Sequence, residues 1–144
     1  MGHRGAQRDA SVVLNTHVLL YWLGADPRLS TAQADVIRQD SPAEPLWVSD
    51  ISLWEIATLY ALSRITLRLP LWDWLEAATA PPLVQRLGIT PAVAAAVAAL
   101  PAWFHSDPAD RIIIASAQVL GGALLMRDQR IIDAALVPTV AYSR

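Results

Sequence analysis

Three carboxylates, Glu55, Asp110 and Asp128, each lie within or beside an apolar segment of this sequence. Charged residues make up 17% of the chain, below the usual quarter, so an acidic residue in an apolar setting is informative. An ionised carboxylate in such a setting is costly unless a partner or a cation compensates it. Hard oxygen ligands suit Mg²⁺ or Mn²⁺, which can activate water and stabilise charge on a phosphodiester. These residues could therefore support metal-assisted hydrolysis, provided that the fold brings them together.

Glu55 lies in a predicted helix that is apolar on nearly every side. At 100° per residue it shares a face with Ile51, Trp54, Thr58 and Leu62. If that face is buried, the carboxylate needs a partner or a cation. The alternative is a partly exposed Glu near the helix start, stabilised by the helix dipole. The periodicity leaves both interpretations open.

Asp110 lies three and four residues before Ile113 and Ile114, which places it on the stripe expected to face the core. The structural alternative is a capped helix start, with Asp107 as N-cap and Pro108 as the first helical residue. Capping is favoured for Asp107, whereas the inward direction of its stripe favours a functional role for Asp110.

Two further side chains are expected at the carboxyl ends of strands. Asp128 follows the apolar run 123–126, and Asn15 follows the run 11–14. In open parallel sheets, ligands bind beyond the carboxyl ends of the strands, near the point where the strand order reverses. The ordinary alternative is that Asp128 and Asn15 each cap the helix that follows.

The elements that must position these residues alternate along the chain. Strands are predicted at 11–14, 46–48, 83–87, 124–126 and 138–140, and helices at 17–23, 31–39, 50–63, 71–80, 91–100, 108–120 and 128–135. This alternation is typical of βαβ units and a mainly parallel sheet. No repeat or linker divides the chain, so residues 11–144 are expected to form a single α/β domain. The polar residues 1–10 are expected to be a disordered lead-in without the apolar core of a signal peptide.

Composition excludes several kinds of function. The absence of cysteine excludes disulfide scaffolds, thiolate metal sites and cysteine nucleophiles. With 11 basic residues, all arginine, against 13 acidic ones, the chain does not bind nucleic acid by bulk positive charge, although a carboxylate cluster can recruit cations that offset phosphates. The absence of lysine disfavours a phosphatase or a receiver-like domain. No apolar run is long enough to span a membrane, so we expect a cytoplasmic protein.

Four segments of the chain resemble the motifs of the PIN domain, specifically of the VapC-like toxins. They occur in the family's order and span nearly the whole chain: 13–22, 49–57, 100–111 and 124–128. The resemblance implies a mainly parallel five-stranded sheet in the order 3-2-1-4-5, flanked by helices. It also implies metal-dependent endoribonuclease activity on RNA, a cognate antitoxin whose tail covers a groove between helices, and homodimerisation.

Carried over by position, Glu55, Asp110 and Asp128 match the family's acidic residues, and Asn15 falls where the family has its first aspartate. These four are the predicted catalytic and Mg²⁺- or Mn²⁺-binding residues. Met126 falls where a Thr or Ser is common. An Asn keeps an oxygen that can reach a metal but loses a negative charge, so cation affinity and activation of water should fall. The sequence leaves open an engineered inactivation, natural divergence, or a catalytically silent module that still binds antitoxin.

Other polar residues near the four are predicted to play supporting roles. Thr16, Ser52 and Arg111 are expected to make polar contacts behind the site. His17 and His105 flank it, but no His-x-x-x-His spacing supports a zinc site.

Arg127 and Arg130 are candidates for contacts with RNA. Most of the six tryptophans are expected in the core. Trp72 and Trp74, two residues apart on a predicted helix, cannot face the same way, so one of them is expected at the surface.

Overall fold

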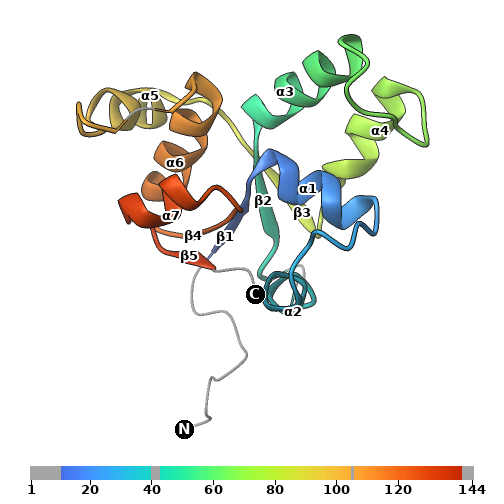
Figure 1. Cartoon of the computed structure of the whole chain (residues 1–144), viewed down its shortest axis with the longest axis horizontal. Coiled ribbons are helices and arrows are strands. Elements are labelled where there is room, and N and C mark those ends of the chain that lie inside the picture. Colours follow the sequence, from blue (N-terminus) through green and yellow to red (C-terminus); the bar gives the residue numbers. More distant parts are fainter. Residues whose placement is uncertain (1–10, 40–42, 105, 141–144) are drawn as a thin grey trace, which may run out of the picture.

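A parallel sheet forms the centre of the computed structural model, which describes residues 11–39, 43–104 and 106–140 (Figure 1). The strands are β1 (Val12–Leu14), β2 (Leu46–Ser49), β3 (Val84–Leu87), β4 (Ala123–Leu125) and β5 (Thr139–Val140). Their order is β3-β2-β1-β4-β5, and the two-residue β5 extends the edge beyond the four longer strands. The predicted α/β class with a parallel sheet is confirmed; the predicted lead-in, 1–10, lies outside the described residues.

The helices lie on both sides of the sheet. On one side are α1 (Thr16–Leu23), α2 (Thr31–Ile37), α3 (Asp50–Ala61) and α4 (Leu71–Ala78), and on the other are α5 (Pro91–Ala98), α6 (Pro108–Leu120) and α7 (Gln129–Ala134) (Figure 1). In the described ranges, no helix combines the length and the apolar character that a membrane crossing requires.

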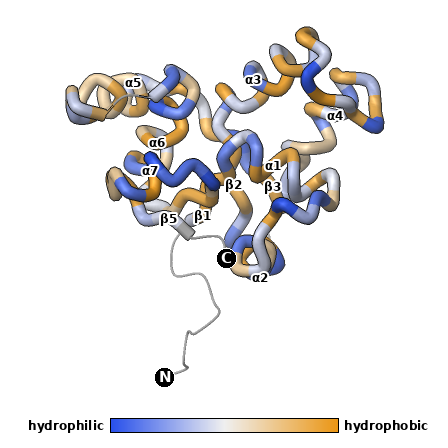
Figure 2. Tube along the Cα trace, viewed as in Figure 1, coloured by the Kyte–Doolittle hydropathy of each residue, from blue (hydrophilic) through white to orange (hydrophobic). Residues whose placement is uncertain are grey.

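Two hydrophobic clusters fix these layers, and β1 contributes to both. Val12 and Leu14 belong to the cluster under α1 and α3, whereas Val13 belongs to the cluster under α6. This division follows from the two-residue period of a strand. Because both faces are covered, all three side chains are buried, which explains the continuous apolar run in the sequence. Figure 2 shows the hydrophobic colour on the strands and on stretches of the helices around them.

Polar side chains cap the helices where the sequence suggests that they should. Asn15 accepts a hydrogen bond from the His17 backbone N–H at 2.9 Å, and Asp107 accepts one from that of Asp110 at 2.8 Å. Asp128 accepts one from the Arg130 N–H at 2.9 Å. The capping roles of these three residues are therefore confirmed. The cap of α1 and the cap of α7 both lie just beyond strand ends.

Helix α3 turns a different face to the core than the one that carries Glu55. Its buried residues are Ser52 and Ile56, while Trp54 and Leu62 are 61% and 59% exposed. The exposed-face alternative for this stripe is therefore correct, and Glu55 lies at its half-buried border.

The expectation that most tryptophans lie in the core is wrong. Three are exposed at the surface: Trp54, Trp72 and Trp103. Three are partly buried against the core: Trp22, Trp47 and Trp74. The predicted division between Trp72 and Trp74 is confirmed.

Gly121 and Gly122 follow the end of α6, and each position requires glycine for a different physical reason. Gly121 has φ +71°, a left-handed conformation that strains other residues, but a Cβ there would meet nothing within 4 Å. At Gly122 a Cβ would collide with the backbone oxygen of Ser11, which is held in place because it accepts the Ala123 N–H at 2.8 Å.

We therefore expect Gly122→Ala to lower the free energy of unfolding by about 3 kcal/mol, as overpacking does. Gly121→Ala should cost about 1 kcal/mol, the strain of a left-handed residue. Urea denaturation of both variants measures the difference. Equal losses would contradict the close approach of β1 to the end of α6.

Candidate active site

Asn15, Glu55, Asp110 and Asp128, which the sequence analysis expects to converge, line one pocket of about 500 Å³. They come from four segments that are far apart in the sequence: the chain just beyond the ends of β1 and β4, the second turn of α3 and the first turn of α6. The fold thus meets the geometric condition on which the expected chemistry depends.

Neighbouring strands bring Asn15 and Asp128 together. The Asn15 backbone N–H donates to the Leu125 carbonyl at 2.9 Å, which continues the pairing of β1 with β4 beyond the strand ends. The chain leaves β1 toward β2 on one side and reaches β4 on the other, so this edge is the switch point of the sheet. Asn15 is 9% exposed.

Two buried hydroxyls position Glu55. The Thr16 hydroxyl donates to the Glu55 carboxylate, and the Thr16 and Ser52 hydroxyls are hydrogen-bonded to each other at 2.8 Å. Both hydroxyl residues are essentially inaccessible to water. A hydrogen bond to a buried donor restricts the carboxylate to one orientation. The structure thus places Thr16 and Ser52 behind the site, where the sequence analysis expects them.

Other predicted residues do not face the pocket. Arg111 donates to the carbonyls of Phe104 and Val97, at 2.9 and 3.4 Å, so it ties down the chain between α5 and α6. It is not among the described residues that line the pocket. The Met126 side chain is fully buried in the core. His105 lies outside the described residues.

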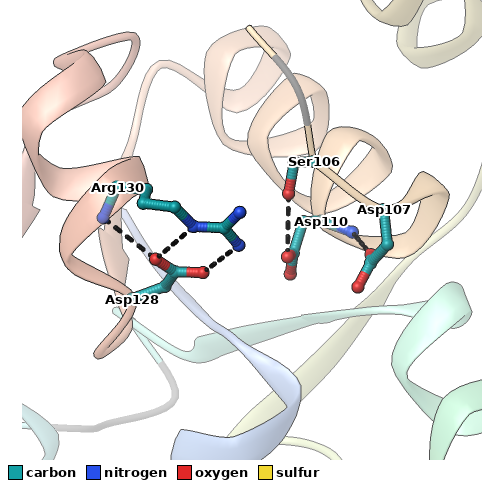
Figure 3. Close-up of polar contacts among 5 residues, drawn as sticks. All are labelled: Ser106, Asp107, Asp110, Asp128 and Arg130. Atoms are coloured by element: carbon teal, nitrogen blue, oxygen red, sulfur yellow. Dashed lines mark hydrogen bonds and ion pairs between the residues drawn. The ribbon is translucent and has the colours of Figure 1, made fainter.

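Asp110 is under electrostatic stress. The pKa of its carboxyl is raised to about 6, chiefly by burial and also by the negative charges of Asp107, Glu55 and Asp128, while a hydrogen bond from Ser106 opposes the rise. The Ser106 hydroxyl lies 2.9 Å from Oδ2 of Asp110 (Figure 3). A raised carboxyl pKa with like charges nearby marks a place of uncompensated negative potential.

Arg130 partly compensates this potential on the other side of the pocket. Its Nη2 lies 2.8 Å from Oδ2 of Asp128, and its side chain extends from the start of α7 toward Asp110 (Figure 3). The hydrogen bond from the Arg130 side chain lowers the pKa of Asp128. Because the Arg130 side chain is 71% exposed and that of Asp128 is 33% exposed, water screens the pair, which is therefore weak, and a stronger cation can displace it.

The donor chemistry fits a divalent cation, although the donors now have protein partners. Three carboxylates and one amide oxygen, without sulfur, are the ligands that Mg²⁺ and Mn²⁺ prefer. Across the described residues, no three His, Cys, Asp or Glu side chains form a ready-made metal cluster. Binding therefore requires these carboxylates to turn from Thr16, Ser106 and Arg130 toward the ion. The raised pKa of Asp110 supports such a change, because a cation would compensate both the burial of the carboxylate and the repulsion from its neighbours.

Tyr21, which lines the pocket, and Ser106, which contacts a residue that lines it, are not among those that the sequence patterns single out. Ser106 precedes the N-cap of α6 and reaches Asp110 across one turn. Tyr21 lies four residues after His17 on α1, and their rings are 6.2 Å apart. Helical spacing places Tyr21 on the face of His17 and could have identified it.

Comparisons with known proteins agree with this architecture. The model of the PIN domain family matches residues 12–136. Ribonuclease VapC22 of Mycobacterium tuberculosis is 40% identical over 121 residues, which cover 84% of this chain and 89% of that relative.

Solved structures show the same fold at low identity. VapBC2 from Rickettsia felis, bound to a DNA fragment from their promoter, matches with a TM-score of 0.69 and 12% identity, covering 92% of this chain and 98% of that one. A toxin–antitoxin complex from Klebsiella pneumoniae matches with a TM-score of 0.63 and 19% identity, covering 92% and 97%. Since the family model spans nearly all of the described domain and a VapC relative matches most of the chain, the chain belongs to the PIN-domain family and is of the VapC type.

Proposed function

We propose that this chain is a metal-dependent endoribonuclease toxin, restrained by a cognate antitoxin and active as a homodimer. The observation that carries the proposal is the convergence of Asn15, Glu55, Asp110 and Asp128 on one pocket. The relative from Mycobacterium tuberculosis is named a ribonuclease, and the structure from Klebsiella pneumoniae is a toxin–antitoxin complex, which supports the partner.

PIN-domain ribonucleases generally use divalent metal ions, and we assign Mg²⁺ or Mn²⁺ to this pocket. Such an ion supplies activated water and neutralises phosphodiester charge. Glu55, Asp110 and Asp128 would hold it, with the amide oxygen of Asn15 as a weaker, uncharged donor. Thr16 fixes the orientation of Glu55 through its hydrogen bond. When Asp128 turns to the ion, the Arg130 guanidinium becomes available to a phosphate of the RNA.

Glu55→Gln tests this function, because it removes one charge and keeps an oxygen that can accept the Thr16 hydrogen bond. We expect the affinity for Mn²⁺ to fall by about 10–100-fold, and RNA cleavage at limiting Mn²⁺ to fall with it. Isothermal calorimetry measures the first effect, and cleavage of a labelled RNA with and without EDTA measures the second.

The matched control is Asp73→Asn, which removes the same charge from an exposed position on α4. It should leave Mn²⁺ affinity and cleavage unchanged. Cleavage that persists in EDTA, or that survives Glu55→Gln, would contradict a metal-dependent mechanism at this pocket.

A second candidate is a catalytically silent module that retains the fold and the antitoxin surface. Asn15 favours it, because its side chain lacks the charge of the family's first aspartate and serves the cap of α1. Failure of both the parent chain and Asn15→Asp to bind Mn²⁺ would select this second function.

A further inference from the structure

A second pocket lies beside the candidate active site and has a positively charged lining. Its volume is about 610 Å³, and its walls come from α1, the end of α3, the segment 64–68 and α4. The described lining includes three arginines, Arg28, Arg64 and Arg68, against one acidic residue, Asp26. We call this pocket the arginine groove.

The arginine groove is continuous with the candidate active site. His17 and Tyr21 line both pockets, so these two side chains form the border between them. An extended ligand that passes from the carboxylate pocket across Tyr21 therefore enters the arginine groove directly.

Cationic groups flank the aromatic ring at this border. The guanidinium carbon of Arg28 lies 4.5 Å from the centroid of the Tyr21 ring, and that of Arg127 lies 5.6 Å from it. Asp26 holds Arg28 in position through hydrogen bonds from Nε and Nη2, the latter at 2.7 Å. Arginines beside a ring face create an environment that attracts both a phosphate and a base.

Arg64 and Arg68 add positive charge on the opposite wall. Both are exposed, and neither is paired with a carboxylate of the described residues. Figure 2 shows hydrophilic colour in the connection from α3 to α4 that carries them. The whole chain has a net charge of −2, yet the described lining of the arginine groove carries three arginines against one acidic residue. Positive charge is thus concentrated in the groove, whereas the adjoining carboxylate pocket has four acidic residues and two arginines in its lining.

We infer that the arginine groove binds the single-stranded RNA segment that flanks the cleaved phosphodiester. Arg64 and Arg68 contact its phosphates, and its bases lie beside the aromatic side chains of Tyr21 and Trp74 that line the groove. This inference rests on the proposed nuclease function and names the part of the substrate that the groove recognises.

RNA fits the groove better than an acidic protein segment does. A negatively charged peptide would match the arginines, but it has no need of a passage into the carboxylate pocket. A substrate that extends on either side of a cleavage point would occupy both pockets, which share His17 and Tyr21 in their lining. The aromatic side chains at that border also match bases, which have a stacking face in every sequence.

The double variant Arg64→Gln/Arg68→Gln in the full chain tests the inference. The probe is a fluorescein-labelled single-stranded RNA of about ten nucleotides and mixed sequence, with Ca²⁺ in place of Mn²⁺, and binding is followed by anisotropy over a range of salt. We expect affinity to fall about tenfold, and the slope of log K against log salt to become shallower by about 1.4, since each phosphate contact in a single strand contributes roughly 0.7. Affinity for Mn²⁺ alone, measured by calorimetry, should not change.

The matched control is Arg38→Gln/Arg86→Gln, which removes two exposed arginines that line neither pocket. It should change RNA affinity less than twofold. An equal loss in both double variants would overturn the inference, because affinity would then follow total charge alone. Thermal denaturation of all variants establishes that they are folded.

The remaining outcomes separate the groove from the proposed function. If the parent chain cleaves RNA and the groove variant binds it as tightly as the parent does, the groove inference is wrong and the nuclease stands. If neither the parent nor Asn15→Asp binds or cleaves RNA, both are wrong. If a glutamate-rich peptide depends on Arg64 and Arg68 while RNA does not, the groove belongs to an acidic protein segment and the inference is overturned.

Discussion

Asn15→Asp is expected to raise Mn²⁺-dependent cleavage of RNA by about 100-fold at neutral pH and limiting metal. The substitution adds a full negative charge at the end of β1, in the pocket that Glu55, Asp110 and Asp128 already line. A charged ligand in place of a neutral one strengthens cation binding and, through the bound ion, the activation of water. The cap of α1 should survive, because aspartate accepts the His17 N–H as well as asparagine does.

Calorimetry with Mn²⁺ and cleavage of labelled RNA measure the two parts of this effect. The matched control is Asn15→Ser, which also caps a helix but adds no charge; it should not gain cleavage. Equal, negligible cleavage by the parent and by Asn15→Asp would count against an impaired nuclease and would favour the silent module.

The same substitution has a second consequence in the absence of metal. A fourth carboxylate in the pocket adds to the repulsion that already raises the pKa of Asp110. Metal-free Asn15→Asp should therefore melt at a lower temperature than the parent. Mn²⁺ should restore its stability, because a ligand that binds only the folded state stabilises it. A destabilisation that Mn²⁺ does not reverse would indicate damage to the cap instead.

Local sequence signals were sufficient to predict features that depend on a single residue and its near neighbours in the chain, such as a helix cap. Asn15, Asp107 and Asp128 cap helices as their types and positions indicate, and Gly121 ends α6 in a left-handed conformation. Periodicity also placed Asp110 correctly, since the Ile113 stripe below it is buried. These signals work because they depend on hydrogen bonds and side-chain directions within one or two turns.

The same signals were insufficient where packing between distant elements determines which way a side chain faces or which partner it contacts. Helix α3 is apolar on nearly every side, so periodicity could not tell that Ser52 faces the core and Trp54 faces water. The pairing of Arg130 with Asp128 depends on how α7 leaves the sheet. The arginine groove joins the segment from His17 to Arg28 with the segment from Arg64 to Trp74, and no sequence period relates the two.

Asp110→Asn is expected to have opposite effects on function and on stability. Loss of this carboxylate should abolish measurable binding of Mn²⁺ and cleavage of RNA, since it removes the most deeply embedded charge of the pocket. In metal-free solution at pH 7, however, the variant should be more stable than the parent by about 1–2 kcal/mol, once the partial exposure of the site is allowed for.

The direction of the stability effect follows from the raised pKa. Asp110 has a pKa of about 6 in the folded chain against an ordinary 3.8, so the folded state binds its proton more tightly than the unfolded state does. This contribution is fully present below pH 3.8 and is lost as the pH rises through 6. The parent should therefore lose stability over that interval in a way that Asp110→Asn does not. Urea denaturation in EDTA between pH 4 and pH 7 measures this difference.

Asp73→Asn is again the control, because it makes the same change at an exposed position outside the pocket; it should not remove the pH dependence that depends on Asp110. If Asp110→Asn is less stable than the parent at pH 7 without metal, Asp110 serves the helix start and not a cation. If it is more stable, the chain retains at the start of α6 a charge that opposes folding. Natural proteins tolerate such a cost at sites where activity requires it, so a gain in stability coupled to a loss of Mn²⁺ binding would identify Asp110 as a residue kept for function.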